Sequence, residues 1–198
     1  MRKVYVYLYE DMADFEVTLL LHRLRKDGGR EIEAIAETLE PVKAQSGLRY
    51  WPDRRIEDTE AADTEALLIP GGPINPGQNA IIPLVREVIH QGGLVGAICF
   101  GPQFLARAGI LKDFRYTTSC TEEKIHQLGL EDPFPRERFV QARVVRDGHL
   151  ITAQGYAFVD FAEAVCDALH IIPEDRRHAL FGRIKATTGG NDHGTERG

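Results

Sequence analysis

Short apolar runs alternate with helix-like segments along most of the chain. Ala66–Ile69 and Leu94–Ile98 hold only apolar or small residues, as do strands that are buried on both faces of a sheet. Between them, Ile81–His90 carries apolar residues at helical spacing. Strands of this kind need helices on both sides. The alternation therefore predicts a three-layer α/β/α sandwich with a mostly parallel, flavodoxin-like sheet.

The same patterns set the bounds of the expected elements. Strands are expected at Lys3–Tyr9, Ile32–Ala36, Ala66–Ile69 and Leu94–Ile98, and extended segments at Tyr116–Thr118, Phe139–Val145 and Leu150–Ala153. Helices are expected at Asp14–Lys26, with Asp14 as N-cap, and at Ile81–His90, Gly101–Ala108 and Phe158–Leu169. A small hairpin is expected to pair Val42–Ala44 with Leu48–Trp51. Together these elements predict one domain, residues 1–184, and a polar tail, residues 185–198.

Charge and hydropathy exclude two classes of protein. The 198 residues include 30 acidic and 24 basic ones, so the formal charge is −6, whereas a nucleic-acid-binding protein is expected to carry a basic face. No apolar run reaches the roughly 18–20 residues needed to span a bilayer. The N-terminus leads directly into an apolar run without a small-residue cleavage site, which argues against a signal peptide. We expect a protein that binds neither nucleic acid nor membranes.

Cysteine and histidine usage indicates a reducing compartment without a metal site. The three cysteines, Cys99, Cys120 and Cys166, are an odd number and have no zinc-ligand spacing. The seven histidines form no His-Glu-X-X-His pattern. The sequence therefore predicts a cytoplasmic protein with no metal and no cofactor.

Cys99 lies in one of three loops that follow expected strands, where open α/β sheets bind ligands. It stands at a strand-to-helix junction between Ala97 and Gly101, a pattern similar to a nucleophile elbow. The positive end of the following helix would favour the thiolate. The alternative interpretation is a buried, inert cysteine.

The other two loops supply candidate partners for this thiol. Glu16, in the first turn of the first expected helix, is placed to point across the strand ends toward Cys99. Its alternative role is compensation of the helix dipole. Gly71 and Gly72 follow a buried strand, so their amides could form an oxyanion hole with the amide of Phe100. A plain tight turn is the alternative for the glycine pair.

Four segments together resemble the ThiJ/PfpI superfamily, the DJ-one-like proteins, which have the class I glutamine-amidotransferase-like fold. The resemblance covers about residues 3–170, and the segments that carry it are Tyr9–Glu16, Leu68–Gly72, Gly96–Pro102 and Ile151–Gly155. It implies that Cys99 is an oxidisable elbow nucleophile and that Glu16 is its carboxyl partner. It also implies oxyanion-hole amides at Gly72 and Phe100, and a homodimer. The Ala-Asp-Phe-Glu stretch is similar to that of small, stand-alone bacterial members.

Two departures from the family pattern bear on activity. Phe100 stands where protease-like members carry histidine directly after the cysteine. Tyr116 stands where many other members carry a second histidine. Without either imidazole, proton transfer to an amide leaving group is difficult, which disfavours peptidase and glutaminase activity. Tyr116, Thr117 and Asp160 are further candidates for the site, and Cys120 is a candidate resolving thiol.

The leading hypothesis is an enzyme of the cysteine-dependent hydrolase or lyase type. Cys99 would attack small electrophiles such as glyoxal-type aldehydes, other small carbonyl compounds or nitrile-like compounds, with a covalent thiol intermediate. The alternative is a redox-sensing or stress-response protein without turnover, in which Cys99 is oxidised. A flavodoxin-like phosphate site is rejected because the first loop carries Glu10, Asp11 and Asp14, which would repel phosphate.

Overall fold

A seven-stranded sheet forms the centre of the computed structural model, which describes residues 2–77 and 79–186. The strand order is β5-β2-β1-β6-β7-β9-β8, and only β8 runs antiparallel to its neighbour. The strands are β1 (Lys3–Tyr7), β2 (Ile32–Ala36), β5 (Arg54–Arg55), β6 (Thr64–Ile69), β7 (Leu94–Ile98), β8 (Val144–Asp147) and β9 (Leu150–Ala153). A separate antiparallel pair consists of β3 (Val42–Lys43) and β4 (Arg49–Tyr50).

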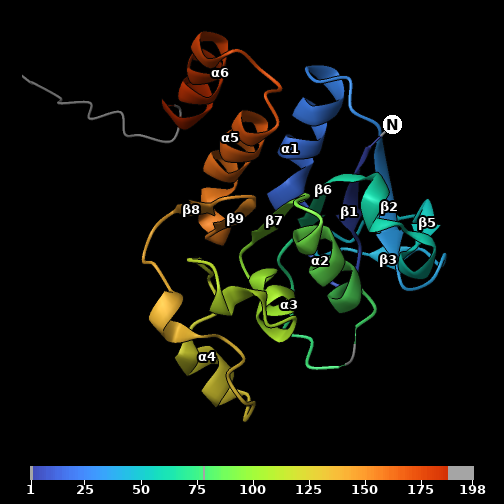
Figure 1. Cartoon of the computed structure of the whole chain (residues 1–198), viewed down its shortest axis with the longest axis vertical. Helices are drawn as coiled ribbons and strands as arrows, with labels where there is room; N and C mark the ends of the chain where they lie inside the picture. Colours follow the sequence, from blue (N-terminus) through green and yellow to red (C-terminus); the bar gives the residue numbers. More distant parts are fainter. Residues whose placement is uncertain (1, 78, 187–198) are drawn as a thin grey trace, which may run out of the picture.

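Helices cover both faces of the sheet (Figure 1). On one face α1 (Phe15–Lys26) packs against α5 (Phe158–Ala168), which also packs against α6 (Glu174–Ala186). On the other face α2 (Ile81–His90) packs against α3 (Pro102–Arg107), and α4 (Glu122–Gln127) lies farther out. Single 3-10 turns are formed by Ile56–Asp58, Ala61–Asp63, Ile110–Lys112, Arg136–Arg138 and Gly155–Ala157. The expected three-layer sandwich is confirmed.

Strand β7 lies in the core and is buried along its whole length. Gly96 in this strand leaves room for α5, because a Cβ there would lie only 3.0 Å from the Phe161 ring. On the other face, Phe104 of α3 meets the rings of Tyr7 and Tyr9 edge-on, at centroid separations of 5.4 and 5.3 Å. Core side chains therefore pack against both β7 and α3, the two elements that flank Cys99.

Several expected bounds were wrong. Residues 139–143 are not in a strand: β8 begins at Val144, and Phe139 forms only an isolated bridge with Tyr116. Helix α6 was not expected, because its sequence has no continuous apolar stripe and buries only Phe181 fully. Lys185 and Ala186 close α6, so the expected tail would begin inside a helix. The rest of that tail, residues 187–198, lies outside the described residues.

Asp14 occupies the N-cap position of α1, but its side chain does not cap the helix. Its carboxylate instead accepts hydrogen bonds from Ser46 (2.6 Å) and Tyr50 (2.8 Å). The hairpin of β3 and β4 is therefore tied to the loop that leads to Glu16.

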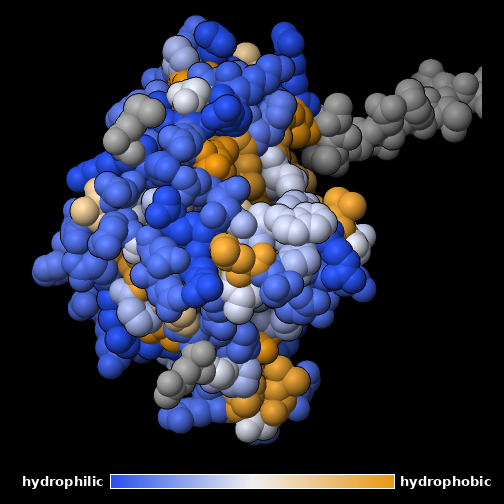
Figure 2. Space-filling model, turned by 90° about the vertical axis from the view of Figure 1, so that its right-hand side faces the viewer, coloured by the Kyte–Doolittle hydropathy of each residue, from blue (hydrophilic) through white to orange (hydrophobic). Residues whose placement is uncertain are grey.

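The surface is mainly polar. On the face in Figure 2, hydrophilic residues dominate and apolar residues form separate small patches. Within residues 2–77 and 79–186, no helix has the length and hydropathy that a membrane crossing requires. Large apolar side chains that remain exposed are Phe15, Leu39, Leu48, Trp51, Leu128 and Tyr156.

Three loops meet where the sheet changes its direction of winding. From β1 the chain crosses through α1 to β2, whereas from β6 it crosses through α2 to β7, on the other side. Ligands of open α/β sheets bind at such a point, beyond the carboxyl ends of the strands. The loops after β6 and β7 carry Gly71 and Cys99, and the loop after β1 leads into the first turn of α1, where Glu16 lies.

Candidate active site

Cys99 occupies a sharp turn between β7 and α3. Its backbone is left-handed, with φ of 61°, a conformation that non-glycine residues adopt only at a cost of about 1–3 kcal/mol. Hydrogen bonds hold the turn: the Cys99 amide donates to Ala153 (2.8 Å), and the Cys99 carbonyl accepts from the hydroxyl of Thr118 (2.7 Å). This geometry turns the side chain away from the sheet, as a nucleophile elbow does.

Glu16 lies against the thiol from the first turn of α1. Its side chain is buried and hydrogen-bonded to Cys99, and its Oε2 accepts the Gly71 amide at 2.7 Å. A Cβ on Gly71 would fall 2.5 Å from this oxygen and 2.6 Å from the Cβ of Cys99. Only glycine fits at position 71, and its amide already donates a hydrogen bond to Glu16. In this structure the Gly71 amide is thus engaged by Glu16 rather than free to face an oxyanion.

Burial sets the protonation of this pair. It raises the pKa of Glu16 to about 7, although hydrogen bonds from Cys99 and the Gly71 amide act in the opposite direction. Burial, followed by the charge of Glu16, raises the pKa of the Cys99 thiol to about 12. The expected shift toward the thiolate is reversed, because burial and the charge of Glu16 outweigh the hydrogen bonds from Ser119 and the Phe100 amide.

A cavity of about 570 Å³ opens above Cys99. Four of its lining residues are aromatic, and the rings of Phe15 and Phe158 meet edge-on with centroids 5.6 Å apart. Among the described residues that line it there is no histidine, lysine or arginine. The lining residues are Ala13, Phe15, Glu16, Gln45, Gly72, Cys99, Phe100, Ser119, Gly155, Tyr156 and Phe158. Such a site suits a small, uncharged and partly apolar molecule.

The sequence matches the family model of the DJ-1/PfpI family over residues 2–168. The chain belongs to the DJ-1/PfpI family.

Individual family members are similar over most of their length. The glutathione-independent glyoxalase DJR-1.2 of Caenorhabditis elegans is 30% identical over 151 residues, 74% of this chain and 76% of that protein. Protein/nucleic acid deglycase 2 of Escherichia coli is 29% identical over 120 residues, 59% of this chain and 70% of that protein. The crystal structure of the DJ-1 superfamily protein Atu0886 from Agrobacterium tumefaciens superposes with a TM-score of 0.83. It has 26% identity and covers 96% of this chain and all of that one.

Of the remaining site candidates, neither Tyr116 nor Thr117 lines the Cys99 cavity. Tyr116 is fully buried, donates to the carbonyl of Pro135 (3.3 Å) and stacks on Phe134. The Thr117 hydroxyl donates to the carbonyl of Ala142 (2.9 Å). Tyr116 therefore does not face the Cys99 thiol in this structure.

Asp160 and Cys120 are also outside the Cys99 cavity. The Asp160 carboxylate pairs with Arg143 and with Lys185, whose Nζ lies 2.7 Å away. The Cys120 side chain is buried and lines a different cavity. The structure therefore gives Asp160 a structural role and does not bring Cys120 to the Cys99 pocket.

Ser119 is a site residue that the sequence analysis missed. Its hydroxyl accepts the Gly155 amide (2.9 Å), lies 3.0 Å from Oε1 of Gln154 and hydrogen-bonds the Cys99 thiol. This last contact lowers the pKa of Cys99. It follows the candidates Tyr116 and Thr117 closely in the chain, but no pattern in the sequence showed that the Ser119 side chain turns toward the thiol.

The raised pKa of Glu16 predicts a pH-dependent stability. Between its unfolded value near 4.5 and its folded value of about 7, the folded chain holds a proton that the unfolded chain releases. The free energy of unfolding should therefore fall by about 3 kcal/mol as pH rises through this window. Glu16→Gln should remove this fall.

Urea unfolding of both proteins at pH 5 and pH 7.5 measures the difference. The other titrating groups contribute equally to the free energy of unfolding of wild type and Glu16→Gln, so their contributions cancel in the difference. Glu40→Gln, which removes an exposed carboxylate, should keep the wild-type dependence. Equal pH dependence in wild type and Glu16→Gln would refute the assignment of the raised pKa to Glu16.

Proposed function

We propose that this protein is a cysteine-dependent enzyme of the hydrolase or lyase type that acts on small, uncharged carbonyl electrophiles, with glyoxal-type aldehydes as the leading class. The observation that carries the proposal is the Cys99–Glu16 pair, in which a thiol contacts a carboxyl whose pKa is about 7. A group that titrates near neutral pH can both take and return a proton. Relatives named glyoxalase and deglycase support the same class of chemistry.

The first step is addition of the thiol to the aldehyde. A bond forms between Sγ of Cys99 and the aldehyde carbon as the π pair of the carbonyl moves to its oxygen. The thiol proton passes to the Glu16 carboxylate and from there to the new alkoxide. The amide of Gly72, at the cavity wall, is the candidate donor to that oxygen; the amide of Phe100 contacts the thiol and favours its charged form. The product is a neutral hemithioacetal.

For a 2-oxoaldehyde the reaction continues without an external oxidant. Glu16 removes the proton from the former aldehyde carbon, and a proton is returned to the neighbouring carbon through an enediol. The aldehyde carbon is oxidised to a thioester as the ketone is reduced to an alcohol within the same molecule. Water then hydrolyses the thioester, which releases a 2-hydroxy acid and the Cys99 thiol.

Cleavage of amides is not part of the proposal. A leaving amine must be protonated, and histidine commonly performs this role. Phe100 follows the cysteine, and no histidine is found among the described residues at the cavity. Peptidase and glutaminase activity are therefore disfavoured.

One observation favours the alternative, a redox-sensing protein. Cys99 is the partly exposed thiol, whereas Cys120 and Cys166 are at most 1% exposed. An oxidant in solution therefore reaches Cys99 first. That all three are free thiols fits the proposed cytoplasmic location. For the proposed homodimer, the exposed rings of Phe15 and Tyr156 at the cavity are candidate contacts.

The test is incubation with glyoxal, methylglyoxal and, separately, glutamine, with products followed by NMR. We expect glycolate and lactate to form catalytically and glutamine to remain intact. Prior alkylation with one equivalent of iodoacetamide should stop the reaction. No aldehyde turnover together with selective addition of oxygen to Cys99 by peroxide would overturn the enzymatic proposal in favour of the redox sensor.

A further inference from the structure

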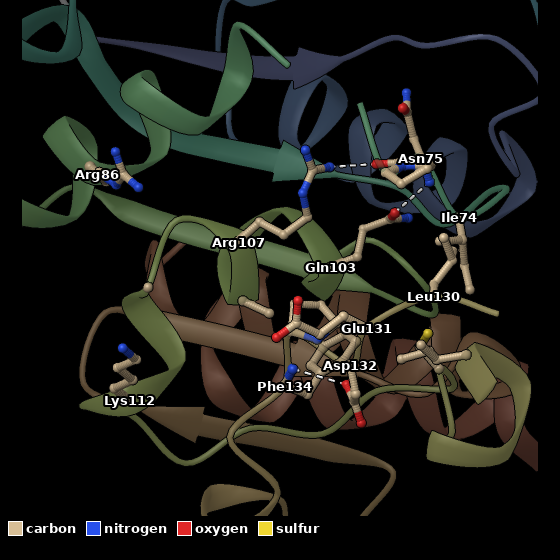
Figure 3. A pocket seen from close by; sticks show the side chains of 16 residues that line it. Ile74, Asn75, Arg86, Gln103, Arg107, Lys112, Leu130, Glu131, Asp132 and Phe134 are labelled. Atoms are coloured by element: carbon tan, nitrogen blue, oxygen red, sulfur yellow. Dashed lines mark hydrogen bonds between the residues drawn. The ribbon is translucent and has the colours of Figure 1, made fainter. Parts of the chain in front are cut away.

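A second cavity, of about 780 Å³, is larger than the one above Cys99. It lies between α2, α3 and the segment 130–134 (Figure 3). Cys120 is also among the lining residues. The neighbouring residue, Ser119, belongs to the Cys99 cavity. The two cavities thus lie on either side of one short segment, and the proposed chemistry uses no residue of the larger one.

Three cations line this cavity without an acidic partner. Arg86, Arg107 and Lys112 form no ion pair with a carboxylate anywhere in residues 2–77 and 79–186. The chain has more acidic than basic residues, with a net charge of −6, so the lack of ion pairs at these three cations does not reflect a shortage of carboxylates. A set of unpaired cations at one concave site favours an anionic occupant.

Arg107 is held in place by neutral groups. Its Nη1 donates to Oδ1 of Asn79 (2.8 Å) and to the carbonyl of Asn75. Burial lowers the pKa of this guanidinium, and no carboxylate reverses the effect. Gln103 fixes the same loop, since its side chain accepts the Asn75 amide (2.7 Å) and donates to the carbonyl of Pro73 (3.0 Å). These hydrogen bonds tie Pro73, Asn75 and Asn79 to α3, and Asn75 lines the cavity.

The acidic groups of the cavity do not neutralise these cations. The Asp132 carboxylate forms its ion pair, at 2.7 Å, with Arg136, which is not one of these three cations. Glu131 is exposed and forms no ion pair in the part of the chain that the structure describes. Figure 3 shows both acids on the segment that faces α3. After the Asp132–Arg136 pair is set aside, the charge of the cavity remains positive.

We propose that this cavity binds a small organic oxyanion with an apolar tail. Carboxylates and phosphate monoesters share the planar or trigonal oxygens that guanidinium groups bind. In this proposal Arg107 binds the oxyanion, and Arg86 and Lys112, which lie apart from it in Figure 3, add attraction at longer range. Ile74, Leu130 and Phe134 contact the tail. The site is separate from Cys99, so the proposal does not depend on the function proposed above.

Calorimetric titration with four matched probes tests the site. They are 3-phenylpropionate, phenyl phosphate, the neutral 3-phenylpropanamide and zwitterionic phenylalanine. We expect the two anions to bind, with affinity that falls as salt rises, and the amide not to bind. Comparison of the two anions tells which oxyanion is preferred. No anion binding, or tighter binding of the amide or of phenylalanine than of 3-phenylpropionate, would overturn the proposal.

Three variants locate the binding. Lys112→Met should weaken 3-phenylpropionate binding about two- to fivefold, as expected for one exposed charge. Glu131→Gln should tighten it by a similar factor, a gain that misfolding does not produce. Arg49→Gln removes an exposed cation on β4, away from the cavity, and should leave it unchanged. Equal affinity in all three variants would contradict the site.

Discussion

Replacement of Cys99 by serine is expected to reduce aldehyde turnover on the order of 10³-fold or more. A hydroxyl has the same shape, but it is a much weaker nucleophile and holds its proton more tightly. The cavity contains no described histidine that could activate it, and Glu16, with a pKa of about 7, is too weak a base for a serine hydroxyl. The rate of 2-hydroxy acid formation from methylglyoxal by the two proteins gives the comparison.

The fold should survive this substitution. Serine accepts the same left-handed backbone at position 99, and the hydrogen bonds that the Cys99 amide and carbonyl form are retained. A matched control is Cys120→Ser, since Cys120 is buried beside the second cavity and should leave turnover within about threefold of wild type. Retention of more than a tenth of the activity by Cys99→Ser would exclude Cys99 as the nucleophile.

The sequence was sufficient to predict the central strands because they are mainly apolar, whereas the two-residue edge strand β5 (Arg54–Arg55) was not expected. β7 was placed correctly at Leu94–Ile98, and β6 differed only at its start. The weakly patterned parts were not predictable in this way. α6 is stabilised by contacts such as Phe181 in the core and Lys185 with Asp160, which join residues far apart in sequence.

For the site, the order of loops brought Glu16 and Cys99 together, because parallel strands end at one edge of a sheet. The order of loops does not predict in which direction each side chain points. Asp160 follows β9 at the same edge, yet it turns to Arg143. The pKa of Cys99 was predicted with the wrong sign, since burial depends on residues from every layer.

Glu16→Gln is expected to change two rates in opposite directions. The Glu16 carboxylate raises the pKa of Cys99 through its charge and its hydrogen bond, and glutamine removes the charge. Each unit of pKa is worth a factor of ten in thiolate at pH 8. Part of this gain is lost because a less basic thiolate is a weaker nucleophile. Alkylation of Cys99 by iodoacetamide at pH 8 should therefore become about tenfold faster.

Turnover of methylglyoxal should fall in the same variant, by about 10²–10⁴-fold, because an amide cannot take or return the proton that Glu16 carries. A merely structural role for Glu16 would slow both reactions together. Peptide mapping of the alkylated protein assigns the label to Cys99, and Glu40→Gln serves as the charge-matched control. Slower alkylation in Glu16→Gln would contradict the electrostatic coupling, and unchanged turnover would contradict proton transfer by Glu16. Faster alkylation of Cys99 together with slower turnover would distinguish the role of Cys99 as nucleophile from the role of Glu16 in proton transfer.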